Sequence, residues 1–255
     1  MNGQELLIFM HMPKTAGTTV AARFRAALQP AEFLPLYGIR RTRNEIEQAI
    51  GEMEAERRQR IRVVCGHQVW YGIHELFDRP PRYVTVLREP ASRVISHFWH
   101  LSRNPESVYF EGIRDGRITL DSWLAGESNP HTINQMTRYL ARDQVGRDPA
   151  DHEAETVTEA TLSRAIERLS RFWFVGLTAA LDLDLSRLLG RLGLEDAGQN
   201  ERLGEPQSKR DRLDIDPALL GVSLRSNWAD HRLFSYGTML RERLLMDLDG
   251  HLPSA

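Results

Sequence analysis

A basic, hydroxyl-rich turn follows the first apolar segment of this chain. Leu6–Met10 is apolar, and the next residues include the run Pro-Lys-Thr-Ala-Gly-Thr-Thr at 13–19, followed by a helix-compatible stretch at 20–28. Lys14 offers a positive charge, and Gly17 permits a close approach or a positive φ. The free amides and dipole of the following helix would attract an anion. The pattern predicts a phosphate-binding turn made of Lys14, Thr15, Ala16, Gly17, Thr18 and Thr19, with Thr18 or Thr19 capping the helix.

The spacing of this turn differs from that of a nucleotide hydrolase. A Walker loop places its lysine directly after the second glycine, whereas Lys14 precedes Gly17, the only glycine nearby. The second and third expected strands end in Cys65-Gly66-His67 and Leu87-Arg88-Glu89, without a convincing aspartate for magnesium. A phosphate site that uses no metal is therefore favoured. A small P-loop kinase with ATP and magnesium, a non-catalytic nucleotide-binding protein and an ordinary strand–helix turn remain alternatives.

A second strand–turn–helix pattern occupies residues 83–98. Arg88 lies at the end of the expected strand, and Pro90 suits the first turn of the helix. Ser92 and Ser96 are four residues apart and share a helix face. We expect Arg88 and Ser96 to be close enough to bind one phosphate. A surface arginine with two solvated serines would show the same pattern.

Together, residues 13–19 and 83–98 resemble the two donor-binding segments of the sulfotransferases that use PAPS (3′-phosphoadenosine 5′-phosphosulfate). The first segment is most similar to the branch that contains heparan-sulfate and uronyl 2-O-sulfotransferases and their bacterial relatives. The resemblance implies that Lys14 to Thr19 hold the 5′-phosphosulfate end of PAPS and that Arg88 and Ser96 bind its 3′-phosphate. Residues 134–140, 174–178 and 227–236 match the same branch more loosely, which extends the resemblance from about residue 6 to residue 246.

His67 is the candidate general base. It follows the second expected strand, at the end of a parallel sheet where ligands bind, and Gly66 would let the backbone turn there. Sulfuryl transfer to an alcohol needs a base that works near neutral pH, which suits histidine. The resembled branch carries a Gly-His at this place, and its histidine acts as the base. The resemblance thus implies that His67 and Lys14 are catalytic. A hydrogen-bonded loop histidine is the alternative for His67, and His11 either shapes the pocket or packs.

The elements expected to position these residues alternate between strands and helices. Such alternation predicts an α/β fold, a three-layer sandwich with a central parallel sheet. The resemblance adds that this is the P-loop-NTPase-like sulfotransferase fold. The irregular segments at 34–41 and 104–152 would line the acceptor cleft, and residues 207–210 are a candidate cover for the nucleotide. The expected strands are Leu6–Met10, Arg62–Cys65, Tyr83–Leu87 and Phe172–Val175, and the helices span 42–60, 89–103, 158–170, 179–192 and 227–248.

Composition limits the partners. The 33 basic residues nearly balance the 35 acidic ones, so no global positive charge indicates nucleic acid, and an anion site must be local. No pair of histidines has metal-ligand spacing with suitable partners, which predicts no metal. The resemblance favours a hydroxyl-bearing acceptor, such as a carbohydrate or glycoconjugate. The sequence does not indicate an oligomeric state.

Compartment and domain organisation follow from simple counts. Cys65 is the only cysteine in the 255 residues, so an intrachain disulfide is excluded and a reducing compartment is expected. No apolar run approaches the roughly 20 residues of a membrane span. The first strand starts near Glu5, which leaves no room for a signal peptide, so we expect a cytoplasmic protein. Residues 1–250 are expected to form one domain and 251–255 a disordered tail.

Overall fold

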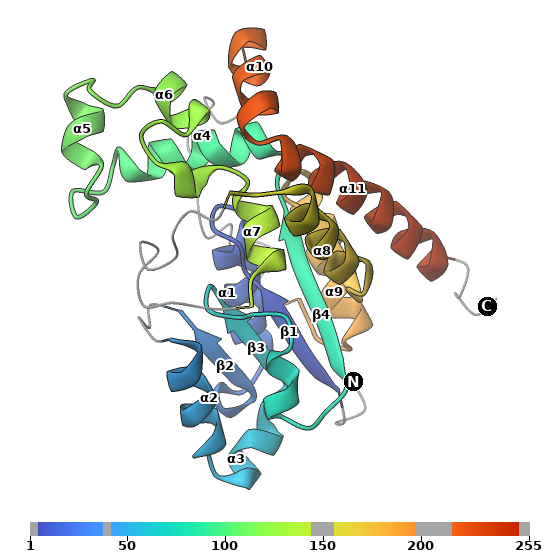
Figure 1. Ribbon diagram of the computed structural model, residues 1–255. Coiled ribbons are helices and arrows are strands. Elements are labelled where there is room, and N and C mark those ends of the chain that lie inside the picture. Colours follow the sequence, from blue (N-terminus) through green and yellow to red (C-terminus); the bar gives the residue numbers. More distant parts are fainter. Residues whose placement is uncertain (1–4, 38–41, 144–155, 197–215, 250–255) are drawn as a thin grey trace.

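A five-stranded parallel sheet forms the centre of the protein (Figure 1). The computed structural model describes residues 5–37, 42–143, 156–196 and 216–249, although not the side chains of 247–249. Within these ranges the strands follow the order β2-β3-β1-β4-β5, and every neighbouring pair is parallel. The strands are β1 (Leu6–Met10), β2 (Phe33–Leu36), β3 (Val63–Gly66), β4 (Pro81–Leu87) and β5 (Phe174–Leu177).

Helices cover both faces of the sheet, as the predicted three-layer sandwich requires. Successive residues of β1 face opposite sides, so Leu6 and Ile8 join one buried cluster and Leu7 and Phe9 join the other. This is why β1 shows no polar alternation. On one face the core includes side chains of α2 (Arg43–Gly51), α7 (Gln135–Ala141), α8 (Glu159–Ser170) and α11 (Trp228–Asp249), and on the other those of α1 (Gly17–Ala27) and α9 (Leu181–Arg191).

A smaller apolar cluster lies apart from the sheet. It joins α4 (Pro90–Leu101), α6 (Leu120–Ala125) and α10 (Pro217–Ser226) around the buried Trp123. Together with α5 (Phe110–Arg114), these helices occupy the upper part of Figure 1. Residues 104–143 were expected to be more irregular than the rest, yet they contain α5, α6 and α7, of which α7 falls in the segment 134–140 that resembled a helix motif. These three helices are only five to seven residues long, too short to show a clear apolar period.

Two expected elements differ from the structure. Residues 34–36 were assigned to an irregular segment, but they belong to β2, which pairs only with β3 at the edge of the sheet. Pro35 obscured this strand, because proline in a strand is tolerated mainly at an edge. The helix expected over 42–60 is two helices, α2 and α3 (Ala55–Arg60), because the chain leaves the helical path after Glu52.

The strands end together at one edge of the sheet. Met10 and Leu36 both pair with Gly66, and Leu87 pairs with Leu177, so the next residues of the chain emerge side by side. These next residues include His11, Tyr37, His67 and Arg88. The carboxyl edge of a parallel sheet is where such folds bind ligands. The fold therefore gathers the predicted site residues.

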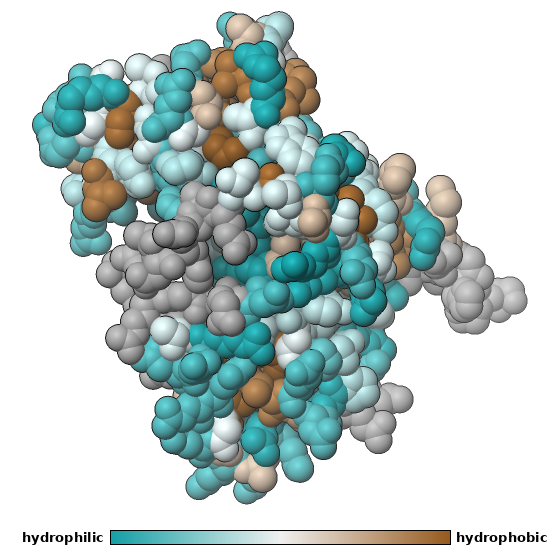
Figure 2. Space-filling view, viewed as in Figure 1, coloured by the Kyte–Doolittle hydropathy of each residue, from teal (hydrophilic) through white to brown (hydrophobic). Residues whose placement is uncertain are grey.

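The surface seen in Figure 2 is mostly hydrophilic, with hydrophobic atoms in small separate groups. Within the described ranges, no helix combines the length and the apolar character that crossing a membrane would require. Residues 207–210, proposed above as a nucleotide cover, and the tail at 251–255 lie outside the described residues. The assignment of residues 1–250 to one domain stays a prediction.

Candidate functional site

The turn after β1 opens toward the N-terminus of α1. Lys14 and Ala16 both adopt left-handed backbone, with φ of 67° and 62°. Such turns direct successive amides into a concave anion site. Ala16 is the N-cap of α1 and makes no side-chain cap, so the expectation that Thr18 or Thr19 caps the helix is wrong. The two left-handed residues bring the chain into the helix at Gly17, which places both threonines inside its first turn. The Thr19 amide donates to the Ala16 carbonyl at 3.1 Å, so the amides of Gly17 and Thr18 are the ones that have no acceptor within the helix.

The threonines of the turn have different surroundings. Thr15 is fully buried, and its hydroxyl donates to the Met12 carbonyl at 2.9 Å. Its hydroxyl thus holds the turn in shape. Thr18 is exposed and Thr19 is half-buried at the start of α1. Of the three hydroxyls, that of Thr18 is the most accessible to a ligand.

Gly17 is required by a close approach. A Cβ built on it would lie 1.8 Å from Cδ2 and 2.0 Å from Nε2 of His11. Its φ is not positive, so the close approach and not an unusual backbone conformation explains the glycine. Gly66 is similar, because a Cβ there would lie 2.1 Å from the Leu36 carbonyl oxygen. The turn and the two neighbouring strand ends are packed too tightly for side chains at these positions.

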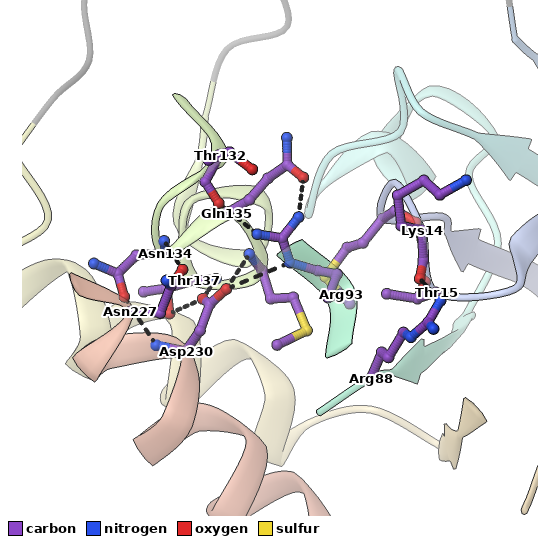
Figure 3. A network of polar contacts seen from close by, with 12 residues as sticks. Lys14, Thr15, Arg88, Arg93, Thr132, Asn134, Gln135, Thr137, Asn227 and Asp230 are labelled. Atoms are coloured by element: carbon purple, nitrogen blue, oxygen red, sulfur yellow. Dashed lines mark hydrogen bonds and ion pairs between the residues drawn. The ribbon is translucent and has the colours of Figure 1, made fainter. Parts of the chain in front are cut away.

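Arg88 connects the second predicted element to the first. Its Nη1 donates to the Lys14 carbonyl at 3.2 Å, so the end of β4 holds the phosphate turn (Figure 3). Glu89 caps α4, because its carboxylate accepts from the amides of Ala91 at 3.0 Å and Ser92 at 2.7 Å. The start of α4 is therefore filled by its own side chain, whereas that of α1 is open. An anion beside α4 would depend on side chains such as Arg88.

Ser96 lies farther along α4 and is 5% exposed. No described residue forms a hydrogen bond with its hydroxyl, which leaves the group available to a ligand. Ser92 is half-buried in the turn before it. The structure thus brings Lys14 and Arg88 into contact and places Ser96 on the helix that Arg88 precedes.

Within the described residues, only one of the two ring nitrogens of His67 has a hydrogen-bond partner. Its Nδ1 lies 2.9 Å from the His11 carbonyl oxygen. A carbonyl oxygen only accepts hydrogen bonds, so Nδ1 carries the proton and donates it. The lone pair of the neutral ring is then on Nε2. Tyr37 lies edge-on to the same ring, with centroids 5.3 Å apart. This is the tautomer that a general base acting through Nε2 needs.

The surroundings of His67 keep it neutral. Burial lowers its pKa below the ordinary value of 6.5, and the positive charge of Arg142 lowers it further. The bond to the His11 carbonyl acts in the opposite direction but is smaller than the effect of burial. The unprotonated form, which is the one that can accept a proton, therefore predominates at neutral pH.

Arg142 was missed by the sequence analysis. It is half-buried, and its Nη2 donates to the carbonyls of His67 and Val69, the latter at 2.9 Å. Its guanidinium also lies 3.8 Å from the centroid of the Tyr139 ring. Arg142 thus fixes the backbone that carries the candidate base. The sequence around it has no motif that marks this role, since the contact spans 75 residues.

Arg93 was missed as well, and it lies at the centre of a buried polar network (Figure 3). Its side chain is 0% exposed. Nη1 donates to Gln135 at 2.7 Å, Nη2 donates to the Thr132 carbonyl, and Nε lies 3.9 Å from the Asp230 carboxylate. Burial lowers the pKa of Arg93, and Asp230 opposes this effect. Arg93, which lies between Arg88 and Ser96 in the sequence, therefore connects α4 to α7 and α11.

The N-termini of α7 and α11 cap each other. Asp230 of α11 accepts from the amides of Met136 at 3.1 Å and Thr137 at 2.8 Å. Asn134, the N-cap of α7, accepts from the amides of Ala229 at 3.0 Å and Asp230 at 3.1 Å. These residues belong to the two motifs, 134–140 and 227–236, that resembled the sulfotransferases more loosely. In the structure, these parts of the motifs fix two helices behind α4.

A metal centre has no support within the described ranges, where no group of three or more histidine, cysteine or acidic side chains could hold an ion. The charges around the turn instead suit an anion. Lys14 is close enough to depress the pKa values of His11, His97 and His100 by its positive charge, after the larger effect of burial. The local positive charge exists although the whole chain carries a net charge of −2.

The parallel sheet, the open start of α1 and the positive cluster define an α/β protein with a phosphate-binding strand–turn–helix arrangement. The sequence model of the Sulfotransferase family matches residues 1–236, and the chain therefore belongs to that family. Among curated proteins no match was found. Membership confirms the predicted superfamily and fold, and it makes the chain a transferase of sulfuryl groups. The kinase and non-catalytic alternatives receive no support.

Proposed function

We propose that the chain transfers the sulfuryl group of PAPS to a hydroxyl of a carbohydrate or glycoconjugate, with His67 as the general base. The observation that carries this proposal is the hydrogen bond from His67 Nδ1 to the His11 carbonyl. It leaves Nε2 free to accept a proton at the carboxyl edge of the sheet, beside the phosphate turn. The resemblance to the 2-O-sulfotransferase branch, through residues 13–19 and the Gly66-His67 pair, supports both the base and the type of acceptor.

The residues present suit the donor. The open amides of α1, the ammonium of Lys14 and the hydroxyl of Thr18 are donors for the phosphosulfate end. Arg88 and the hydroxyl of Ser96, which has no hydrogen bond to a described residue, are donors for the 3′-phosphate. When bound, PAPS supplies an activated sulfuryl group with adenosine 3′,5′-bisphosphate (PAP) as its leaving group. No metal is needed in this scheme.

Each residue then has a role in transfer. His67 Nε2 accepts the proton of the acceptor hydroxyl while the acceptor oxygen forms its bond to sulfur and the sulfur–oxygen bond to the 5′-phosphate breaks. Lys14 neutralises the charge that develops on the departing phosphate oxygen, and the amides of the turn hold the sulfuryl oxygens. Arg142 keeps the backbone of His67 in place.

The donor site is tested by calorimetric titration. The wild-type protein should bind PAP more tightly than adenosine 5′-monophosphate, because only PAP carries the 3′-phosphate. Arg88→Ala and Ser96→Ala should reduce this preference. Equal affinity of the wild-type protein for both nucleotides would contradict the assignment of Arg88 and Ser96.

The base is tested by turnover. His67→Ala should lower kcat by about 10²- to 10⁴-fold, the usual contribution of a general base, and still bind PAP. Wild-type turnover in a folded His67→Ala protein would remove His67 from this role. The acceptor is identified by incubating the enzyme with radiolabelled PAPS and a panel of glycans, glycolipids and small alcohols, followed by mass spectrometry. Labelling confined to non-carbohydrate alcohols would overturn the proposed acceptor class.

A further inference from the structure

His11 is a buried polar side chain that the scheme above leaves without a role. It is 4% exposed and directly follows β1, two residues before Pro13. Its Nδ1 lies 2.9 Å from the Tyr37 hydroxyl, but none of the described residues forms a hydrogen bond with its Nε2. The Cδ2–Nε2 edge of the ring occupies the space where a side chain on Gly17 would be. The free nitrogen is therefore placed at the first residue of α1, beside the open anion site.

The contacts of Tyr37 decide which nitrogen of His11 carries the proton. The Tyr37 hydroxyl lies 2.9 Å from both His11 Nδ1 and Cys65 Sγ. A thiol is a weak donor and a weak acceptor, whereas an imidazole nitrogen is a strong acceptor for a phenol. The favoured arrangement has the Tyr37 hydroxyl donating to Nδ1 and the Cys65 thiol donating to Tyr37. His11 then carries its proton on Nε2.

The two stacked histidines thus have opposite tautomers. Their ring centroids are 4.1 Å apart. His67 is protonated on Nδ1 by its bond to a carbonyl and offers a lone pair at Nε2, whereas His11 accepts at Nδ1 and offers a proton at Nε2. Burial, the neighbouring His67 and Lys14 lower the pKa of His11 to about 2, so it stays neutral at all working pH values.

We propose that His11 is a neutral hydrogen-bond donor, through Nε2, to the 5′-anionic end of the donor nucleotide, and that Tyr37 is the positioning residue that fixes its tautomer. The proposal rests on the proposed function, since it takes the anion at the start of α1 to be the 5′-end of PAPS. His11 thus adds to the turn a hydrogen-bond donor that stays neutral, and its ability to donate does not change with pH. Gly17 is then a glycine because any side chain would displace this imidazole.

The first experiment compares two nucleotides that differ only at the 5′ position. His11→Phe should bind PAP about 10- to 150-fold more weakly than wild type, the range expected for losing a hydrogen bond to a charged group. Its affinity for adenosine 3′-monophosphate, which lacks the 5′-phosphate, should stay within about twofold of wild type. His11→Gln should recover most of the PAP affinity, because its amide nitrogen can occupy nearly the same place as Nε2 and donate.

The outcomes separate this inference from the proposed function. If the wild-type protein binds neither nucleotide, the proposed function fails and His11 has no donor role. If wild type binds PAP but folded His11→Phe binds it equally well, or loses both nucleotides equally, the His11 inference alone is overturned. Circular dichroism and thermal melting establish which variants are folded.

A second measurement needs no variant of His11. Long-range ¹H–¹⁵N spectra of ¹⁵N-histidine-labelled wild-type protein should show that the ring assigned to His11 is neutral and protonated on Nε2. Tyr37→Phe should shift the Nδ1 signal of that ring and weaken PAP binding less than His11→Phe does. A His11 ring protonated on Nδ1 in the wild-type protein would overturn the proposal even if His11→Phe failed to fold.

Discussion

At the scale of single residues, the chemistry of the site depends on which ring nitrogen of His67 and of His11 carries the proton. His67 and His11 are stacked, yet the His11 carbonyl and the Tyr37 hydroxyl give them opposite tautomers. Neither assignment needs a nearby carboxylate. The strand ends supply both partners directly, because β1, β2 and β3 finish at one edge of the sheet.

The first prediction concerns the pH dependence of turnover. The active form of His67 is the neutral one, and burial places its pKa below 6.5. Activity should therefore be lost as pH falls and should rise to a plateau, with the midpoint of kcat/KM below pH 6.5. A pH–rate profile of the wild-type enzyme measures this midpoint. An acid limb centred above 6.5, or one that persists unchanged in the residual activity of His67→Ala, would show that another group controls it.

The second prediction concerns the close approach at Gly17. Gly17→Ala places a methyl group 1.8 Å from His11, so either the ring or the start of α1 must move. We expect a loss of about 1–3 kcal/mol in the free energy of unfolding, typical of overpacking, together with weaker PAP binding. Urea denaturation and calorimetry measure the two effects.

Gly190→Ala is the matched control for that change. Gly190 lies within α9, and no atom of the described residues is within 4 Å of a Cβ built there. Replacing it should stabilise the protein by about 0.5–1 kcal/mol, because alanine loses less conformational entropy in a helix. PAP binding should not change. If Gly17→Ala behaved like Gly190→Ala, the packing of His11 against α1 would be refuted.

At the scale of elements, a buried polar network holds α4, the helix that carries Ser96 and follows Arg88, in its position. Asn134 and Asp230 cap each other's helices, and Arg93 joins this pair from α4. A fully buried ion pair is weak evidence for net stability, but removing one partner leaves an uncompensated charge. The network therefore makes the position of α4 depend on α7 and α11.

The third prediction follows from this dependence. Asp230→Asn removes the countercharge of Arg93 and one acceptor for the amides of α7, so it should lower the free energy of unfolding by about 3–5 kcal/mol. PAP affinity should fall too, because Arg88 and Ser96 flank Arg93 on the chain. Urea denaturation measures the first effect and titration the second.

A double-mutant cycle and an exposed pair provide the controls. Arg93→Met combined with Asp230→Asn should cost less than the sum of the single changes, because it removes both charges. Glu167→Gln breaks the exposed pair with Arg171 and should change stability by less than about 1 kcal/mol. Strict additivity of the two buried changes would indicate that Arg93 and Asp230 do not interact.

These elements also show what a sequence can predict. Local signals found β1, β3, β4 and β5, because each is a short apolar run between turns. The strand-end positions of Lys14, His67 and Arg88 followed from these strands alone. The roles of Arg93, Arg142 and Tyr37 could not be predicted, since each depends on contacts between residues distant in sequence. The same holds for Asn134 and Asp230, because each side chain caps the helix of the other and the two residues are 96 positions apart.

At the scale of the whole molecule, the buried histidines link stability to pH. Burial lowers the pKa of His97 to about 3, and positive charges from Arg93 and Lys14 add to the effect. His11 has a pKa of about 2 for similar reasons. In the unfolded chain both would titrate near 6.5. Below that pH the unfolded chain binds protons that the folded protein does not, so stability must fall as pH falls.

The fourth prediction gives this linkage a magnitude. Between pH 6.5 and pH 3, each of these two histidines should remove about 1.4 kcal/mol of unfolding free energy per pH unit, which is about 2 kcal/mol each at pH 5. Urea denaturation of wild type at several pH values between 7.5 and 5 measures the combined slope. His97→Phe should reduce that slope by the contribution of one histidine, about 1.4 kcal/mol per pH unit. This holds whatever the variant does to stability at pH 7.5. Because the reading is a slope, the loss of the contact between His97 and Thr132 does not affect it. An unchanged slope in His97→Phe would mean that His97 binds a proton in the folded protein as readily as in the unfolded chain, which would contradict the combined effect of burial, Arg93 and Lys14 on its pKa.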